Sequence, residues 1–274
     1  MTDEPLLQCT GVSVSFRQRG RAAPFYAVRD ASLDVGAGRI VGLVGESGSG
    51  KSTLARAIVG LQRIDAGSIT FQGTTFGRTR TAADRRGIQM IFQDPYGSLD
   101  PRMKIRSALA EIIRRHTDLR GKAIDDRCAE LMDMVRLPRS ILASRPAGMS
   151  GGQRQRVAIA RALSINPRLL VADEPVAALD VSVQAGIVNL LSELRREVGL
   201  SILFISHDLS IVRTLCDSVS VIYRGEVVEA QPCADLFAHP RDDYTKTLLS
   251  AIPRLNGPRT EGLADGQSVT MRRP

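Results

Sequence analysis

A glycine-rich loop between an apolar strand and a helical segment constrains the fold of this chain more than any other feature. Ile40–Val44 is continuously apolar, as in a strand buried on both faces. Residues 45–52 follow directly and fit the pattern G-x-x-x-x-G-K-[ST], and residues 52–61 then have a helical pattern closed by Gly60. Strand, loop and helix in this order form a unit whose backbone amides cradle phosphate groups. The sequence therefore predicts an α/β core with a phosphate-binding loop.

Each residue type in this loop has a role in binding phosphate. The glycines let backbone amides wrap the phosphates, Lys51 reaches the β and γ oxygens, and the hydroxyl of Ser52 is a ligand for Mg²⁺. The candidate nucleotide-binding residues of the loop are Gly45, Glu46, Ser47, Gly48, Ser49, Gly50, Lys51, Ser52 and Thr53.

Two further apolar runs end in polar residues that suit catalysis. Residues 169–172 are followed by Asp173 and Glu174, and residues 201–205 are followed closely by His207. Ligands of open α/β sheets bind beyond the carboxyl ends of the strands, so these side chains should converge on the phosphate loop. One carboxylate there can hold Mg²⁺ while its neighbour orients or deprotonates an attacking water. We predict Asp173 as a metal ligand and Glu174 and His207 as catalytic residues.

A second anion-binding feature lies at residues 149–153, before a periodic helical run at residues 157–163. A hydroxyl residue and two glycines ahead of a helix describe an N-terminus with open backbone amides. Such a terminus binds anions through its amides and its dipole, without a lysine. The candidate binding residues here are Ser150, Gly151, Gly152 and Gln153. Two phosphate-binding loops of different design indicate more than a simple nucleotide-binding enzyme.

The flanking segments carry patterns of antiparallel strands. Residues 7–16 and 27–35 alternate like half-buried strands, and the polar, basic residues 17–24 between them indicate a loop. Near the other end, residues 219–223 and 226–230 flank Arg-Gly and predict a hairpin.

The middle of the chain is different in kind. Residues 98–147 contain no strand-like run, and residues 107–115 and 125–135 have helical apolar spacing. We therefore predict a helical insertion in the α/β core, ending at the loop of residues 149–153. Residues 256–274 are rich in Gly, Arg and Thr with little apolar content, which predicts a disordered tail.

Composition excludes several classes. An apolar content of 43% suffices for a buried core, no run approaches the roughly 18 apolar residues of a membrane span, and residues 1–5 lack the order of a secretion signal. The cysteines Cys9, Cys128, Cys216 and Cys233 have no metal-type spacing and are expected to be reduced, buried or half-buried thiols. The net charge of +8 is spread along the chain and aromatics make up only 4%, so no nucleic acid partner is expected.

Together these motifs resemble the nucleotide-binding subunit of ATP-binding cassette (ABC) transporters, over residues 7–253. The corresponding motifs are Walker A at residues 45–52, the Q-loop at Gln93, the signature loop at residues 149–153, Walker B at residues 169–174, the D-loop at residues 178–180 and the switch histidine at His207. The resemblance implies a P-loop NTPase (RecA-like) core with an N-terminal antiparallel β subdomain and an inserted α-helical subdomain.

The resemblance also implies roles and cofactors. The bound groups would be ATP and Mg²⁺, with Glu174 polarising the attacking water and Gln93 reaching the metal and linking the site to a membrane subunit. An aromatic residue before Walker A would stack on adenine; Phe16 matches best, and Tyr26 is the alternative. Two protomers would sandwich two ATP molecules, each signature loop capping the γ-phosphate held by its partner's Walker A loop.

A narrower resemblance is to the importer branch for oligopeptides, dipeptides and nickel. It rests on residues 92–102, on residues 173–176 and on a C-terminal stretch at residues 239–253. The implied partners are membrane-spanning permease subunits, a second ATP-binding subunit (identical or different) and, indirectly, an extracytoplasmic solute-binding protein. Peripheral association with the cytoplasmic face of the inner membrane is expected. Peptide, nickel and other small solutes stay open as cargo.

Departures from the family pattern bear on the alternatives. Met149 replaces a usual Leu, which should be tolerated, and Ala177 replaces a common Ser. Since no cysteine follows Cys233, no iron–sulfur centre is expected. The rival classes are a soluble ABC ATPase acting on nucleic acid or the ribosome, an exporter cassette, and a non-catalytic subunit, which would need damage at Glu174 or His207.

The predicted domain organisation follows. Residues 1–255 form one ATP-binding domain, with the helical subdomain inserted at about 98–157 and an importer-type extension at about 232–255. Residues 256–274 are the predicted tail.

Overall fold

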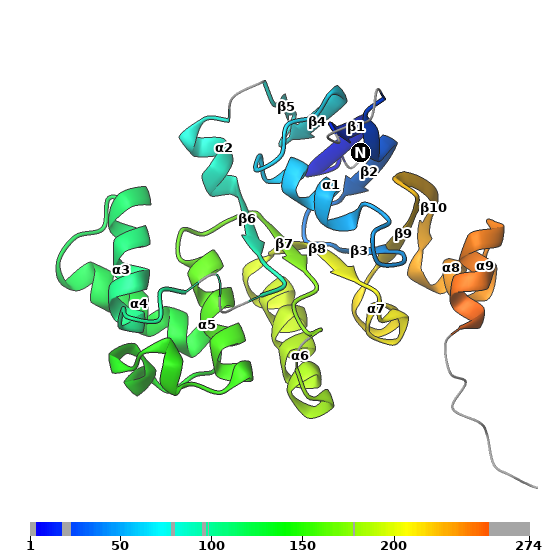
Figure 1. Ribbon diagram of the computed structural model, residues 1–274. Coiled ribbons are helices and arrows are strands. Elements are labelled where there is room, and N and C mark those ends of the chain that lie inside the picture. The colour runs from blue at the N-terminus through cyan, green and yellow to red at the C-terminus, as the bar shows by residue number, and fades with distance from the viewer. Residues whose placement is uncertain are drawn as a thin grey trace, which may run out of the picture.

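The computed structural model describes residues 4–17, 23–77, 80–94, 97, 99–177 and 179–251. Within these residues the chain forms two sheets of different kind and a group of helices at one side (Figure 1). Some predicted features lie outside the described residues, in part or as a whole. They are most of the loop at residues 17–24, part of the stretch at residues 92–102, Ala178 of the D-loop and the tail at residues 256–274.

The first sheet is antiparallel and four-stranded, in the order β2-β1-β4-β5. Its strands are β1 (Leu7–Phe16), β2 (Phe25–Val35), β4 (Ala66–Phe71) and β5 (Thr74–Thr75). Buried and exposed residues alternate along much of β1 and β2, as the sequence pattern predicted. Strand β2 begins two residues before the predicted start at residue 27, and Phe25 pairs with Phe16 across the two strands.

The second sheet is six-stranded, in the order β10-β9-β3-β8-β7-β6. Its strands are β3 (Ile40–Val44), β6 (Ile88–Ile91), β7 (Leu169–Asp173), β8 (Ser201–Ser206), β9 (Ser218–Tyr223) and β10 (Glu226–Pro232). All neighbours are parallel except β10, which forms the predicted hairpin with β9. The strands β3, β7 and β8 are buried along their whole length, which explains their continuous apolar sequence.

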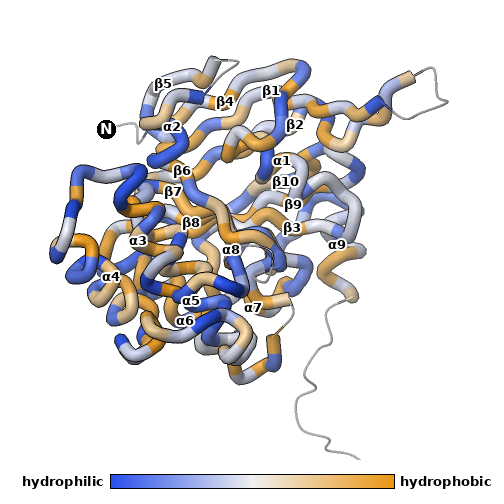
Figure 2. Tube along the Cα trace, turned by 60° about the vertical axis from the view of Figure 1, so that its left-hand side comes forward, coloured by the Kyte–Doolittle hydropathy of each residue, from blue (hydrophilic) through white to orange (hydrophobic). Residues whose placement is uncertain are grey.

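Apolar residues cover both faces of this parallel sheet. On β3, Ile40 and Val44 belong to one core cluster, while Val41 and Leu43 belong to the other, because side chains alternate along a strand. The first cluster joins the sheet to the helical part, and the second joins it to the antiparallel sheet. Figure 2 shows the apolar colour running along the central strands.

The helices are α1 (Lys51–Ile58), α2 (Ala82–Gly87), α3 (Ile105–His116), α4 (Lys122–Met134), α5 (Gly151–Leu163), α6 (Val181–Val198), α7 (Leu209–Leu215), α8 (Cys233–Ala238) and α9 (Asp243–Ser250). Two short 3₁₀ helices, η1 (Arg139–Ala143) and η2 (Pro146–Gly148), precede α5. Among the described residues, no helix combines the length and the apolar character that crossing a bilayer requires.

Helix α1 ends at Ile58, three residues before the predicted end at residue 61. The glycine predicted to close the helix, Gly60, lies two residues after this end. Gly60 has a φ of 80°, its amide donates to the carbonyl of Ala57 at 3.0 Å, and the amide of Leu61 donates to the carbonyl of Arg56 at 2.8 Å. This pair of bonds is the Schellman arrangement, in which a left-handed glycine ends a helix.

The predicted helical insertion is present. α3, α4, η1 and η2 lie to the left of the parallel sheet in Figure 1, and α5 leads back to it. Buried Arg127 of α4 donates to the carbonyl of Leu163 at 2.9 Å, which ties the insertion to the end of α5. Met149 is buried in the same core cluster, so the departure at this position is accommodated by packing. The fold class predicted from the sequence is therefore confirmed.

Candidate nucleotide-binding site

The phosphate loop joins β3 to α1, and two of its glycines are required by close backbone contacts. A Cβ atom on Gly45 would lie 2.2 Å from the carbonyl oxygen of Ile222. A Cβ atom on Gly50 would lie 2.4 Å from the carbonyl oxygen of Ala27, and Gly50 also has a φ of 110°. Only glycine fits these positions without moving neighbouring backbone. The fold thus holds this loop against β9 and against β2.

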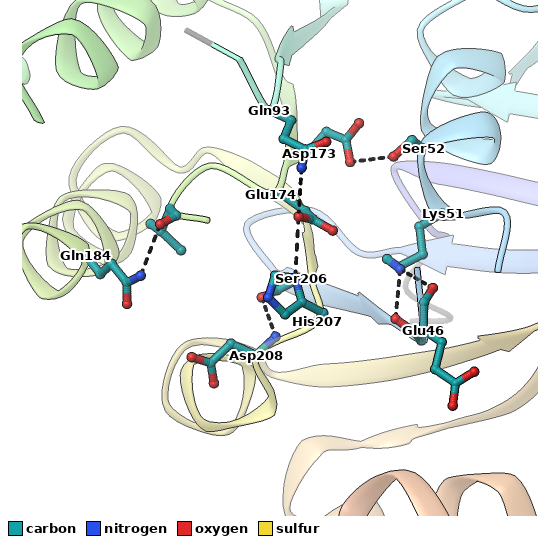
Figure 3. A network of polar contacts seen from close by, with 12 residues as sticks. Glu46, Lys51, Ser52, Gln93, Asp173, Glu174, Gln184, Ser206, His207 and Asp208 are labelled. Atoms are coloured by element: carbon teal, nitrogen blue, oxygen red, sulfur yellow. Dashed lines mark hydrogen bonds and ion pairs between the residues drawn. The ribbon is translucent and has the colours of Figure 1, made fainter. Parts of the chain in front are cut away.

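Lys51, the first residue of α1, points back into the loop (Figure 3). Its Nζ donates hydrogen bonds of 2.7 Å to the carbonyl oxygens of Gly45 and Glu46, and the side chain is buried. Burial lowers the pKa of Lys51, and the nearby carboxylates of Glu174 and Asp173 act in the opposite direction. The loop therefore encloses a positive charge, as a site for anionic phosphates requires.

Ser52 and Asp173 bring two oxygen atoms together beside the loop. The hydroxyl of Ser52 donates to Oδ1 of Asp173 at 3.0 Å, and Asp173 is buried at the end of β7. Burial raises the pKa of Asp173; the hydrogen bond from Ser52 opposes the rise, and the charge of Glu174 adds to it. A hydroxyl and a carboxylate on rigid elements form a donor set that fits Mg²⁺, which takes few protein ligands together with substrate phosphates.

The carboxylate of Glu174 is the meeting point of three strand ends. Its Oε2 accepts a hydrogen bond from Nε2 of Gln93 at 3.1 Å and lies 3.4 Å from Nδ1 of His207. Gln93 follows β6, Glu174 follows β7 and His207 follows β8. Glu174 has a φ of 46°, an uncommon conformation for this residue type, held by a bond from its amide to the carbonyl of Ile205 at 3.0 Å. The convergence predicted from the strand ends is thus observed.

A cavity of about 740 Å³ lies over the phosphate loop and this carboxylate. Its volume is in the range of small-molecule sites. Its walls are Phe16, Phe25, Ala27, Gly45, Glu46, Ser47, Gly48, Gly50, Lys51, Ser52, Thr53, Gln93, Glu174, His207 and Leu248. Of the predicted loop residues, only Ser49 is absent from the walls, because its side chain is buried within the fold.

The two aromatic residues predicted to stack on adenine, Phe16 and Tyr26, line different cavities. Phe16 lines this cavity, whereas Tyr26 lines a neighbouring cavity of about 970 Å³ together with Tyr223 and Arg224. Phe25 also lines the site, and sequence reasoning missed it because its pairing with Phe16 depends on the register of β1 and β2. Phe25 is the cross-strand partner of Phe16, so the two rings reach the same cavity.

The signature loop lies elsewhere. Ser150 is the N-cap residue of α5; its hydroxyl accepts from the amide of Gln153 at 3.3 Å, and Oε1 of Gln153 accepts from the amide of Ser150 at 3.0 Å. Such a capping box fixes a helix start. A Cβ atom on Gly152 would lie 2.6 Å from Cγ1 of Val183, and one on Gly151 would meet Leu179. None of these four loop residues lines the cavity of its own chain.

Two supporting residues have no local sequence signal. Nε2 of Gln184 donates to the carbonyl oxygens of Val176 and Leu179, at 3.1 and 3.0 Å, and thereby holds the turn after β7 (Figure 3). The hydroxyl of Tyr244 accepts a 3.0 Å hydrogen bond from the amide of Glu46, across most of the length of the chain. Contacts between such distant segments depend on the tertiary fold.

The site and fold agree with the comparisons to known proteins. The family described as ABC transporter matches residues 28–177, and the chain belongs to this family of ATP-hydrolysing proteins. A second family, described as oligopeptide/dipeptide transporter, C-terminal region, matches residues 228–272.

Relatives and solved structures point the same way. The chain is 44% identical over 252 residues to the oligopeptide transport ATP-binding protein OppF of Streptococcus mutans, covering 90% of this chain and 82% of that protein. It is 43% identical over 233 residues to OppF of Lactococcus lactis, covering 84% of this chain and 73% of that protein.

A dimeric structure of the ATP-binding cassette MJ0796 bound to ADP and Pi has a TM-score of 0.74 at 27% identity, over 83% of this chain and 98% of that one. CbiO1 from Clostridium perfringens, part of an ABC transporter complex, has a TM-score of 0.76 at 26% identity, over 86% and 91%.

Proposed function

We propose that this chain is the ATP-hydrolysing subunit of a peptide importer. The observation that carries the catalytic part is the meeting of Gln93, Glu174 and His207 at one carboxylate oxygen beside the phosphate loop. The similarity to two OppF proteins and the match at residues 228–272 support peptides as the cargo.

In this proposal the phosphate loop binds the triphosphate of ATP. The amides of residues 47–53 and the ammonium of Lys51 surround the phosphates, after Lys51 leaves its present acceptors on the loop. Ser52 and Asp173 hold Mg²⁺, with Gln93 as a further ligand, and the ion adds positive charge beside the phosphates. Phe16 and Phe25 enclose the adenine ring from the mouth of the cavity.

Glu174 acts on the attacking water. Its carboxylate, 15% exposed, accepts a hydrogen bond from the water and draws its proton as the oxygen approaches the γ-phosphorus. His207 and Gln93 orient this carboxylate from the ends of β8 and β6, the strands on either side of β7, and reach toward the γ-phosphate.

The signature loop serves a second nucleotide. Ser150, Gly151, Gly152 and Gln153 form an anion-binding helix N-terminus that does not line the chain's own cavity. A second cassette, identical or different, would bring ATP to this loop, and this chain's ATP would be capped in return. The dimeric assembly of MJ0796 supports this arrangement.

The remaining partners follow from the transporter family. Membrane-spanning permease subunits would contact the helical insertion and the Gln93 segment, so that this chain would lie at the cytoplasmic face of the membrane. An extracytoplasmic solute-binding protein would deliver the cargo. The domain boundaries at residues 98, 157, 232 and 255 stay predictions.

The test is isolation of the tagged chain from its native membranes, with identification of co-purifying subunits and uptake assays in cells that lack the chain. We expect permease subunits and a cassette to co-purify, and uptake of a labelled oligopeptide to be lost. Loss of nickel uptake with intact peptide uptake would reassign the cargo. Recovery in the soluble fraction with salt-dependent nucleic acid binding would instead favour the rival class.

A further inference from the structure

The C-terminal helices touch the phosphate loop. Figure 1 shows α8 and α9 beside the end of β10, and α9 lies within the segment that matches the transporter C-terminal region. The hydroxyl of Tyr244 on α9 accepts a hydrogen bond from the amide of Glu46 at 3.0 Å. Leu248, four residues later on the same face of the helix, lines the nucleotide cavity with Lys51 and His207. One short helix therefore reaches both the loop and the cavity.

The ring of Tyr244 is also fixed in place, by packing against a second aromatic ring. It stacks on Tyr223 at a centroid distance of 4.1 Å and an interplanar angle of 27°. Tyr223 ends β9, and two residues later the amide of Gly225 donates to the carbonyl of Ser49 at 2.8 Å. The phosphate loop is thus fixed at Glu46 by α9 and at Ser49 by the β9–β10 turn.

A buried carboxylate anchors α9 on the sheet. Glu229 of β10 accepts hydrogen bonds from the amides of Arg241 and Asp242, at 2.8 and 3.0 Å. Burial alone raises the pKa of Glu229, but these bonds and its other hydrogen bonds outweigh that effect and hold the pKa below its ordinary value. Asp242 in turn caps the helix by accepting from the amide of Tyr244 at 2.9 Å. The start of α9 is therefore tied to a charged group in the fold.

Glu46 connects Tyr244 to Lys51, the lysine of the phosphate loop. Its amide donates to the hydroxyl of Tyr244, and its carbonyl accepts from Nζ of Lys51 at 2.7 Å. We propose that Tyr244 is a positioning residue for the phosphate loop, and that the C-terminal extension thereby sets the affinity of the site for ATP. The inference rests on the proposed function, because it takes ATP as the ligand of this cavity.

The physical reason is conformational freedom. Residues 45–50 contain three glycines, which lose more backbone entropy on ordering than any other residue. A loop already fixed in its binding conformation does not incur that cost when ATP arrives. Since coupling between two sites is reciprocal, bound ATP should also stabilise α9.

The first measurement compares Tyr244→Phe with the unchanged full-length chain. Phenylalanine keeps the stacking on Tyr223 and removes only the hydroxyl. With a fluorescent ATP analogue and Mg²⁺, we expect about 3- to 10-fold weaker binding, the effect of one neutral hydrogen bond. Lys246→Gln is the matched control, because Lys246 lies on the same helix and its exposed ammonium pairs with Asp243 at 2.7 Å; the ATP affinity of this variant should be unchanged.

The second measurement separates positioning from stability. Without nucleotide, the unfolding midpoint of Tyr244→Phe should stay within about 2 °C of the parent's, less than the shift expected for 1 kcal/mol in a domain of this size. Amide hydrogen exchange in α9 should slow when ATP is added to the parent, and much less in Tyr244→Phe. Equal ATP affinity in both proteins, or a lower midpoint with unchanged affinity, overturns the inference while leaving the proposed function intact. An unchanged chain that fails to bind ATP overturns both.

Discussion

Nδ1 of His207 lies 3.4 Å from Oε2 of Glu174, although the two residues follow different strands. The same oxygen accepts the hydrogen bond from Gln93. Because Gln93 and His207 both lie against the carboxylate of Glu174, a change in that carboxylate alters the surroundings of both side chains.

Replacing Glu174 by Gln keeps the size of the side chain and removes its basicity. We expect ATP to remain bound and hydrolysis to fall by about 10²- to 10⁴-fold, the usual contribution of a general base. Phosphate release by the complex with its membrane subunits measures the effect. Hydrolysis at the parental rate would remove Glu174 from the proposed catalytic role.

Replacing Asp173 by Asn should stabilise the nucleotide-free protein while weakening Mg²⁺-dependent nucleotide binding. Burial raises the pKa of Asp173, so the folded state binds its proton more tightly than the unfolded state does. The stability that this group contributes is present below the unfolded pKa of about 3.9 and is lost as pH rises through the folded pKa. The gain in unfolding midpoint should therefore be present at pH 7 and absent near pH 3.

Asp243→Asn is the matched control for this series. The hydrogen bond from Lys246 lowers the pKa of exposed Asp243, so its contribution has the opposite sign: present at neutral pH and lost as pH falls. Thermal unfolding of both variants at several pH values tests the pair. A lower midpoint for Asp173→Asn at pH 7 would show that the bond with Ser52 outweighs the burial of the charge.

Phe16→Ala and Phe25→Ala should each weaken ATP binding by about 1 to 3 kcal/mol, the range for stacking of a base on an aromatic ring. Both rings are partly exposed, at 41% and 48%, so folding should change little. Calorimetric titration gives the affinities. Tyr26→Ala is the control, since Tyr26 lines the other cavity; an effect there without one at Phe16 contradicts the assignment.

Gly152→Ala should destabilise the fold by about 1 to 3 kcal/mol, the usual cost of overpacking. The new methyl group would lie 2.6 Å from Cγ1 of Val183, a β-branched side chain that strongly prefers one χ1 rotamer in a helix. Gly148→Ala is the control, because a Cβ atom there meets nothing within 4 Å. Urea unfolding compares the two, and equal midpoints would show that α5 and α6 can separate slightly at no cost.

The cysteines should resist alkylation in the folded protein. Burial raises the pKa of Cys9 to about 12, an effect to which nearby Asp34 adds, and all four thiols are buried. At pH 8 only about 10⁻⁴ of such a thiol is thiolate, the reactive form. Labelling with iodoacetamide followed by mass spectrometry should show slow modification before unfolding and complete modification after. Rapid labelling of Cys9 in the folded protein would contradict its burial on the core face of β1.

Sequence reasoning succeeded where a motif is local. The strand, loop and helix around Lys51 follow one another directly, and the helix start predicted at residues 149–153 lies within a single helical turn. The end of α1 was predicted from Gly60 because a left-handed glycine satisfies the last carbonyls of a helix. The start of β2 was missed, and Phe25 with it, because strand ends depend on pairing across the sheet.

The sequence by itself determined which polar residues follow each strand and the order of the motifs, because those signals lie within a few neighbouring residues. Only the tertiary structure decided that Phe16 and Phe25, and not Tyr26, line the cavity, and that the loop beginning at Ser150 stays outside it. The tertiary structure also places the hydroxyl of Tyr244 within hydrogen-bond distance of the amide of Glu46. Such contacts depend on sheet order, strand register and helix packing. These properties result from many weak interactions between residues that are distant in the sequence, so no short segment predicts them.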